Sequence, residues 1–389
     1  METEITAAEL ARLRDGDYAI IDIRDATAFD YGHIGGAVNI PLKELAEAEL
    51  PAGKKLVLYC KSGIISLDAA EELRGRGYEA YSLAGGYIDW LRERMNDRNV
   101  TEQVELSLRK KFKKSIWCKF TKAINEYELV QPNDRIAVCI SGGKDSMLMA
   151  KLFQELKRHD KFPFEVVFLV MDPGYSPENR RIIERNAESM SIPVQIFESM
   201  IFDSVLHIEK NPCYICARMR RGYLYSKAKE PGCNKIALGH HFDDVIETIL
   251  MGMLYGGQVQ TMMPKLHSTN FEGMELIRPL YLVREADIKH WRDYNDLYFI
   301  QCACKFTENC SSCSENGQSE SKRLEVKNLI AEMKKINPQV EKNIFRSVEN
   351  VNLSTIIAYK EKGAVHHFLD DYDGGEPPQA VRADTRKLV

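Results

Sequence analysis

The sequence predicts an α/β protein with two doubly wound parallel-sheet domains. Short β-rich runs alternate with helical patterns in two separate parts of the chain, which is typical of parallel strands joined by crossover helices. The chain has 389 residues, of which 44% are hydrophobic and 28% are charged, so it is long enough for more than one domain and can bury substantial cores. We expect domains over residues 1–99 and 100–365, followed by a polar, mobile tail over 366–389.

The expected elements follow the same alternation in both domains. In the first domain, the pattern predicts strands at 18–23 and 55–59 and helices at 7–14, 66–76 and 86–95. A linker is expected near 96–101, where the apolar periodicity is lost. In the second domain, the pattern predicts strands at 135–140, 165–171 and 194–197 and helices at 109–122, 146–158, 177–190 and 321–334. A cysteine-rich loop spans 301–317.

Composition excludes several classes of protein. The longest apolar stretches, such as 164–171, are far shorter than the ~20 residues of a membrane span, and the acidic N-terminus lacks the basic and apolar regions of a secretory signal. We therefore expect a cytoplasmic protein with no membrane partner. Ten cysteines are too few for a disulfide scaffold in a chain of this kind, which favours metal binding or thiol chemistry.

Cys60 is a candidate nucleophile. It follows the strand at 55–59 and precedes a helix, whose N-terminal N–H groups favour a thiolate or persulfide anion. A single cysteine after a strand is more often a small buried residue, so the surrounding motifs decide the interpretation. They are IDIRDATAFDYGHIGGAVNIPL (21–42), CKSGIIS (60–66) and LAGGYIDW (83–90), and in them the chain resembles a rhodanese domain. That resemblance implies that Cys60 carries sulfane sulfur as a persulfide. Rhodanese loops often have Arg where this chain has Ile65, and Asp22, Arg24 and His33 are assigned structural roles.

A glycine-rich loop lies between the strand at 135–140 and the following helix. Glycines let the backbone approach a phosphate, and the helix N-terminus faces its charge. Lys144 would neutralise phosphate oxygens, Ser141 and Ser146 would add hydroxyl donors, and Asp145 would hold Mg²⁺. The Walker pattern is absent. The motif SGGKDS, which contains Gly142 and Gly143, closely resembles that of PP-loop ATPases, a family that cleaves ATP between the α and β phosphates to adenylate a carbonyl oxygen. The catalytic residues are therefore expected to be Cys60, Lys144 and Asp145.

Further ATP-binding residues are expected where other strands end, because the carboxyl ends of parallel strands form the ligand crevice. Asp172 ends the LVMDP run, and Gly239, His240 and Asp243 lie in ALGHHFDDVIE. Ordinary capping or core roles explain about half of such histidines. Aspartates at the start of a helix also complement its dipole.

The cysteine pattern points to a metal centre. Cys213 and Cys216 form a CxxC pair, which alone fits zinc, an iron–sulfur cluster or a redox disulfide. The ordered motifs SGGKDS, CYICARMRRGYLY, ALGHHFDD, MLYGG, MMPKL and IRPL resemble the tRNA-cytidine 2-sulfurtransferase family over about 109–359. The resemblance implies a [4Fe–4S] cluster with three cysteine ligands. Cys302 is chosen as the third ligand, with Cys304 as the alternative. The pair Cys310 and Cys313 fits either a zinc site or a surface loop.

The remaining cysteines and the basic segment complete the sequence interpretation. Cys118, Cys139 and Cys233 are expected to be buried packing thiols. The run at 109–122 holds seven Lys and Arg and no acid, which fits either a solvated amphipathic helix or a surface that contacts phosphates. Arg218, Arg220 and Arg221 add positive charge beside the expected cluster.

The motifs together predict a sulfurtransferase that thiolates tRNA. The expected cofactors are ATP, Mg²⁺ and [4Fe–4S], and the expected partners are tRNA and a sulfane sulfur donor. Two alternatives stay open: the same machinery acting on another base or a small metabolite, and an iron–sulfur or nucleotide-binding regulator. The sequence also leaves open whether the chain forms a homodimer.

Overall fold

The computed structural model describes residues 3–13, 16–51, 53–94, 100–199, 201, 212–300, 322–370 and 372. Most of the expected linker, the cysteine-rich loop at 301–317 and residues 373–389 of the tail expected over 366–389 lie outside the described residues. The chain divides into two compact units, Met1–Asp244 with Met263–Ser319 and Val245–Met262 with Glu320–Val389. None of the helices in the described part combines the length and hydropathy that a membrane crossing requires.

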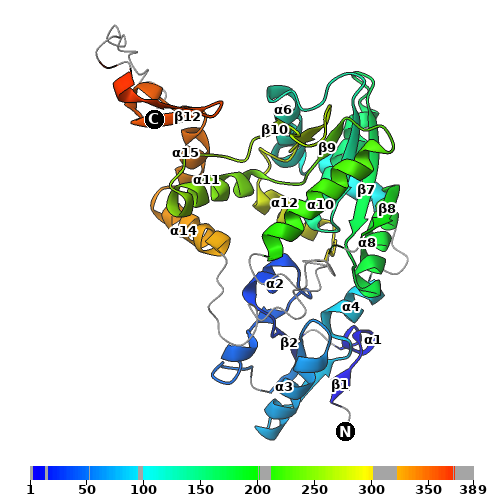
Figure 1. Ribbon diagram of the computed structural model, residues 1–389. Coiled ribbons are helices and arrows are strands. Elements are labelled where there is room, and N and C mark those ends of the chain that lie inside the picture. Colours follow the sequence, from blue (N-terminus) through cyan, green and yellow to red (C-terminus); the bar gives the residue numbers. More distant parts are fainter. Residues whose placement is uncertain are drawn as a thin grey trace. The chain divides into compact units, whose positions relative to one another are not determined.

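The first sheet has five parallel strands in the order β1-β5-β4-β2-β3 and belongs to the blue part of the ribbon in Figure 1. Its central strand is a continuous apolar run in which residues 56–59 are fully buried, as expected for a parallel strand covered on both faces. The strands are β1 (Glu4–Ile5), β2 (Tyr18–Asp22), β3 (Val38–Asn39), β4 (Lys55–Tyr59) and β5 (Ala80–Leu83). The helices are α1 (Ala7–Leu10), α2 (Ala26–Tyr31), η1 (Leu42–Glu44), α3 (Ile64–Gly75) and α4 (Gly86–Arg94).

The second sheet has six strands in the order β10-β11-β9-β6-β7-β8, and the edge strand β10 alone runs antiparallel to its neighbour. The predicted α/β class with two doubly wound sheets is thus confirmed, and the second sheet is mixed at one edge. The strands are β6 (Arg135–Ile140), β7 (Glu165–Asp172), β8 (Val194–Glu198), β9 (Lys235–Ala237), β10 (Lys265–His267) and β11 (Glu275–Ile277). The helices between and after them are α7 (Lys144–Arg158), α8 (Pro177–Ser189), α10 (Pro212–Lys229), α11 (Phe242–Gly256) and α12 (Glu285–Tyr294).

Successive side chains of β6 point to opposite faces of this sheet and pack against different helices. Ala137 and Cys139 belong to a buried cluster with Tyr225 and Ala228 of α10, and α10 contacts β7 and β9. The intervening residues of β6 point to the opposite face, and α7 contacts β6. The ends of β6 and β9 therefore carry their loops to one edge of a sheet that helices cover (Figure 1).

The basic segment differs from the prediction of one helix over 109–122. It consists of α5 (Thr101–Arg109), the π-helical turn η2 (Lys113–Trp117) and α6 (Cys118–Glu126). In the π turn, Trp117 N–H donates to the carbonyl of Phe112, five residues earlier, at 3.2 Å. The expected apolar face is real, because Phe112, Ile116 and Phe120 are buried. Cys118 is exposed, so its assignment as a buried thiol is wrong: it lies off the face that buries Ile116 and Phe120.

The second unit contains most of α11, the last helices of the chain and a small hairpin. Its elements are α14 (Lys322–Ile336), α15 (Val340–Ser347), η3 (Leu353–Thr355), β12 (Ala358–Glu361), β13 (Ala364–His367) and η4 (Phe368–Asp370). Strands β12 and β13 pair antiparallel. Within this unit, the Tyr255 hydroxyl donates to Glu325, and Arg323 Nε lies 3.6 Å from Glu247 Oε2.

Candidate functional site

Cys60 directly follows β4 and sits at the N-terminal side of α3. Its side chain is buried, with 5% exposed. The backbone N–H of Gly63 donates to Sγ at 3.2 Å, and the hydroxyl of Ser66, 3.4 Å from Sγ, is within reach to donate to it. Both donors favour negative charge on the sulfur, as does the helix N-terminus. The loop therefore has the geometry that an anionic sulfur nucleophile requires.

The loop after Cys60 is held against the turn that begins α4. Tyr87 N–H donates to the carbonyl of Cys60 at 2.9 Å, and Ile88 N–H donates to the carbonyl of Lys61 at 3.2 Å. Gly86 has φ +61°, and a Cβ at this position would lie 2.5 Å from the nitrogen of Gly63. The motif at 83–90 therefore needs a glycine at the point where its backbone contacts the loop at 60–66.

The residues assigned structural roles near this loop make structural contacts. Arg24 Nη2 donates to Asp22 Oδ2 at 2.6 Å and to the carbonyl of Gly32 at 2.7 Å. His33 Nδ1 lies 2.9 Å from the carbonyl oxygen of Phe29, and the two rings stack with centroids 3.9 Å apart. These contacts fix the chain that follows β2.

The glycine-rich loop connects β6 to α7. Gly142 has φ +85°, and a Cβ there would lie 2.5 Å from Cγ1 of Ile183, so a side chain is excluded by both conformation and space. Ser146 Oγ donates to the carbonyl of Gly143 at 2.9 Å and accepts from the N–H of Ser141 at 3.2 Å. The loop is thus closed by its own hydroxyl groups at the start of a helix, which is a suitable geometry for binding an anion.

Lys144 is almost completely buried at this loop, with 2% exposed. Its Nζ lies 3.2 Å from Asp145 Oδ2 and 3.4 Å from Glu285 Oε1. Asp145 Oδ1 is buried and has no hydrogen-bond partner in the described part of the chain. Lys144 is thus a buried cation between the carboxylates of Asp145 and Glu285. Oδ1 of Asp145 can accept a further ligand.

The end of β9 approaches the same loop. A Cβ on Gly239 would lie 3.3 Å from the nitrogen of Ser146, so the two loops pack closely. His240 follows and is partly exposed. His241 is 7% exposed, with Nε2 4.0 Å from Asp145 Oδ1 and Nδ1 3.4 Å from Asp244 Oδ2. Gly239 and His241 are therefore brought to the PP-loop motif.

Asp243 makes contacts that the sequence did not indicate. It forms an ion pair with Arg284, whose Nη2 donates to Oδ1 at 3.0 Å, and Oδ2 accepts from the N–H of Glu285 at 2.7 Å. Asp243 therefore anchors the start of α12, which presents Glu285 to Lys144. Sequence reasoning missed Arg284 and Glu285; an acid in the first turn of a helix indicates only that it complements the dipole.

Asp172 lies at the end of the neighbouring strand. Ile140, the last residue of β6, pairs with Val170 of β7, so Asp172 at the end of β7 lies two residues beyond this pair, as does Gly142 in the loop after β6. Asp172 Oδ1 accepts from the N–H groups of Gly174 and Tyr175 at 2.9 and 2.7 Å, and Oδ2 lies 3.3 Å from Arg180 Nη1. These contacts cap its own loop.

The expected cluster ligands lie largely outside the described structure. Cys213 and Cys216 are three positions apart on α10, and their side chains are outside the described residues. Cys302, Cys304, Cys310 and Cys313 are outside them altogether. Among the described side chains, no three His, Cys, Asp or Glu residues gather as a metal site. Arg218 and Arg221 of α10 are exposed.

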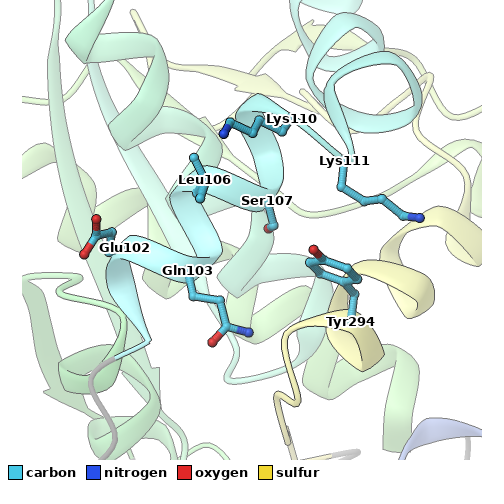
Figure 2. Close-up of a pocket in the computed structure, with 7 residues that line it drawn as sticks. All are labelled: Glu102, Gln103, Leu106, Ser107, Lys110, Lys111 and Tyr294. Atoms are coloured by element: carbon cyan, nitrogen blue, oxygen red, sulfur yellow. The ribbon is translucent and has the colours of Figure 1, made fainter.

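A groove lies between α5 and the end of α12, with a volume of about 440 Å³ (Figure 2). Tyr294 faces the side chains of α5 across it, and Lys111 Nζ lies 5.8 Å from the centre of the Tyr294 ring. Tyr294 is 52% exposed, and its ring packs edge to face against that of Phe112, with centroids 5.6 Å apart. Arg109 is not among the residues that line the groove, and its Nη2 lies 2.7 Å from Glu155 Oε2. The groove is lined by Glu102, Gln103, Leu106, Ser107, Lys110, Lys111 and Tyr294.

Both folds and both loops correspond to known families. The model of the rhodanese-like domain matches residues 6–93, and the model of the PP-loop domain matches residues 112–305. The chain is therefore a sulfurtransferase of the PP-loop class with an N-terminal rhodanese-like domain, which confirms both resemblances.

Relatives identify the family more closely. The tRNA-cytidine(32) 2-sulfurtransferase of Alkalilimnicola ehrlichii is 34% identical over 262 residues, covering 66% of this chain and 79% of that protein. The protein of the same name from Coxiella burnetii is 34% identical over 242 residues, covering 61% and 90%. The protein of the same name from Neisseria meningitidis is 39% identical over 186 residues, covering 46% and 57%. The chain belongs to the tRNA-cytidine 2-sulfurtransferase family.

Two solved structures are also similar to parts of the chain. The U34-tRNA thiolase NcsA from Methanococcus maripaludis, solved with its [4Fe–4S] cluster, has 22% identity and a TM-score of 0.46. It covers 59% of this chain, and 76% of its own length is matched. A rhodanese-related protein from Thermoplasma volcanium has 32% identity and a TM-score of 0.22, with coverage of 23% and 91%.

Proposed function

We propose that this enzyme converts a cytidine of tRNA into 2-thiocytidine, using ATP to activate the base and sulfur that Cys60 carries as a persulfide. The observation that carries the proposal is the loop at 141–146, where buried Lys144 lies beside Asp145 at the start of α7. The family relationship supports tRNA as the substrate, and the relatives' name specifies the cytidine at position 32.

ATP would bind with its phosphates at this loop. Lys144 would neutralise phosphate oxygens, and the N–H groups at the start of α7 would face the remaining charge. Oδ1 of Asp145, which has no hydrogen-bond partner among the described residues, is a hard oxygen ligand of the type that Mg²⁺ prefers. Mg²⁺ is usually held by one or two carboxylates together with substrate phosphates. Asp145 would therefore hold Mg²⁺ against the nucleotide.

Activation is needed because the carbonyl oxygen O2 of cytosine is a poor leaving group. O2 of the base attacks the α-phosphorus of ATP, a new O–P bond forms and pyrophosphate leaves. Sulfur then attacks C2, a C–S bond forms and AMP leaves with the former O2. Lys144 stabilises negative charge that develops on the phosphates during the first step, an electrostatic effect that commonly contributes much of an enzyme's rate.

The rhodanese-like domain would supply the sulfur. The Cys60 thiolate attacks the sulfane sulfur of a donor, a new S–S bond forms at Cys60, and the donor leaves as its own anion. Gly63 N–H and the Ser66 hydroxyl lie where they stabilise the charge on the Cys60 sulfur. Sulfane sulfur must gain two electrons to reach the level of the thiolated base, and a thiol reductant would supply them.

A [4Fe–4S] cluster would be held by Cys213, Cys216 and Cys302. Thiolates are the usual ligands of such clusters, and Cys213 and Cys216 form a CxxC pair in the sequence. When bound by three cysteines, the cluster would supply one iron without a protein thiolate, as a binding place for sulfur. The support for it is the cysteine pattern and the family.

The groove in Figure 2 would contact the RNA. Lys110 and Lys111 are exposed and bring positive charge to its rim, and Tyr294 offers a ring face on which a splayed-out base can stack. Lys113 and Lys114 are exposed immediately beyond it. Single-stranded loops of RNA have bases that such a surface can accept.

A reconstituted reaction tests the proposal. Anaerobically purified enzyme is incubated with unmodified tRNA, ATP, Mg²⁺, a persulfide donor and a dithiol reductant, and the products are nucleosides resolved by mass spectrometry. We expect 2-thiocytidine and AMP in a 1:1 ratio, and no 2-thiocytidine from a strain that lacks the gene. Formation of a different thiolated nucleoside, or ATP hydrolysis to ADP with no thiolation, would overturn it.

A further inference from the structure

The sulfur of Cys60 has one fixed donor and one that can turn. The Gly63 N–H, 3.2 Å from Sγ, is held in the backbone. The Ser66 hydroxyl, 3.4 Å from Sγ, can rotate about its C–O bond. The direction of the Ser66 proton therefore depends on what else competes for it.

Three acceptors surround that proton. Besides Sγ, Ser66 Oγ lies 3.1 Å from the carbonyl oxygen of Gly63 and 2.9 Å from Oγ of Ser82. Ser82 Oγ is itself 3.3 Å from the same carbonyl oxygen. Ser66 and Ser82 are both completely buried, so no bulk water reaches either hydroxyl. The two hydroxyl protons are thus shared among these oxygen and sulfur atoms.

The charge on the sulfur decides the arrangement. A neutral thiol is a weak acceptor, so the Ser66 proton is better directed to the Gly63 carbonyl. An anionic sulfur is a stronger acceptor, because hydrogen bonds to charged groups are stronger than those between neutral groups. When Ser66 turns to the anion, Ser82 can donate to Ser66 Oγ or to the Gly63 carbonyl. That carbonyl also accepts from the N–H of Leu67 at 3.1 Å, so it is satisfied in either arrangement.

We propose that Ser66 and Ser82 form a two-hydroxyl relay that turns toward the sulfur of Cys60 when that sulfur is anionic, as the thiolate or as the persulfide. Ser66 is then a positioning residue for sulfur transfer, and Ser82 of β5 keeps Ser66 in this orientation through the hydrogen bond between the two hydroxyl groups. The inference deepens the proposed function only at Cys60, since it concerns the charge on that sulfur and requires neither ATP nor tRNA.

The other surroundings of the sulfur do not provide this effect. The buried cluster around Cys60 is apolar, with Ile21, Leu58 and Ala70 among its members. Charged residues on the loop and on the helices next to it are Lys61 on the loop, Asp68 on α3 and Asp89 on α4, whose carboxylate packs against Gly85. All three stay unchanged in variants of the serines, so a difference between variants reports the hydroxyls.

Alkylation of Cys60 by iodoacetamide tests the relay, because only the thiolate reacts. The rate at Cys60 is measured in the full-length protein from pH 5 to 10 by peptide mass spectrometry. In Ser66→Ala we expect the pH of half-maximal rate to rise by about one unit, so that the rate below it falls about tenfold, the consequence of losing one charge-assisted hydrogen bond. In Ser82→Ala we expect a smaller shift in the same direction. The plateau rate at high pH should not fall.

A matched control is Ser199→Ala, which removes a buried hydroxyl just after β8, the edge strand of the other sheet. It should leave the Cys60 profile unchanged. A variant that fails to fold would expose Cys60 and raise the rate at every pH, the opposite of the expected effect. Ser66→Ala with a wild-type melting temperature and an unshifted profile would overturn the proposal. A shifted profile would support it even if the enzyme thiolated no tRNA.

Discussion

Glu285 Oε1 lies 3.4 Å from Nζ of Lys144, although the two residues belong to helices far apart in the sequence. Arg284 and Asp243 hold the beginning of α12 in place, so that Glu285 provides one of the two carboxylates around a lysine that is 2% exposed. A buried cation requires such compensation. ATP phosphates would provide the same negative charge when the nucleotide binds.

This pairing predicts how Lys144 and Glu285 respond to substitution. Lys144→Ala should lower ATP-dependent thiolation by about 100-fold or more, because it removes a charge that stabilises the reacting phosphates.

Glu285→Gln should lower the melting temperature of the nucleotide-free enzyme, and ATP should recover part of that loss. Thermal unfolding with and without ATP checks this. Equal losses in both conditions would show that the phosphates do not take the place of the carboxylate.

Cys60→Ser should abolish the transfer of sulfur from a sulfane donor, because the hydroxyl of serine does not form the persulfide. ATP binding should be unaffected, since the nucleotide is expected at a different sheet. Persulfide on the intact protein is measured by mass spectrometry and ATP binding by calorimetry. Cys118→Ser is the matched control, because Cys118 is exposed and has no expected role. Persulfide retained at wild-type level in Cys60→Ser would contradict the assignment.

The groove predicts a salt-dependent effect on tRNA binding. Lys110→Glu with Lys111→Glu should weaken binding and reduce the slope of log K against log salt by roughly 0.7 to 0.9 for each lost phosphate contact. Tyr294→Ala should weaken binding by about 1 to 3 kcal/mol, the usual contribution of stacking one base. This loss should be the same at every salt concentration, because the tyrosine ring carries no charge. Lys122→Glu is the control, since Lys122 already pairs with Glu126. An unchanged slope would exclude this face as the RNA contact.

The cysteine assignment predicts which variants keep iron. Anaerobically prepared protein should hold about one cluster, and Cys213→Ala, Cys216→Ala and Cys302→Ala should each lose it, because a site with three ligands has no spare thiolate. Cys304→Ala and Cys310→Ala should retain it. Iron analysis and visible absorption measure the outcome. Stoichiometric zinc without iron in the wild type would remove the cluster from the proposal.

Two buried thiols predict a loss of stability at alkaline pH. Burial raises the pKa of Cys139 to about 12 and that of Cys233 to about 11, from 9.0. A group whose pKa is raised by folding stabilises the fold below the unfolded pKa, and this stability is lost as the pH rises through the folded pKa. The free energy of unfolding should therefore fall above about pH 9, by up to about 1.4 kcal/mol per pH unit for each thiol.

Urea denaturation of variants measures the contribution of these thiols. Cys139→Ala and Cys233→Ala should each show a flatter pH dependence than the wild type between pH 9 and 10.5. Cys118→Ala should match the wild type, since its thiol is exposed in the folded protein. If all three variants lost stability with the wild-type slope, other groups would be responsible for the alkaline effect.

Local sequence patterns determined the two sheets and the two loops. The runs at 56–59 and 136–140 are apolar throughout, as is typical of central strands that a parallel sheet buries on both faces. The motifs at 60–66 and 141–146 each follow such a strand and precede a helix, so chain order alone brings Cys60 and Lys144 to helix N-termini. These features depend on residues that are close together in the chain.

Only the tertiary structure decided which distant side chains complete each loop. Ser82 meets Ser66 because β5 lies beside β4, and Glu285 meets Lys144 because Asp243 and Arg284 fix the start of α12. Cys118 is exposed because a π turn sets which face of α6 is buried. Strand order and helix rotation arise from packing of the whole domain, and no short segment of sequence contains that information.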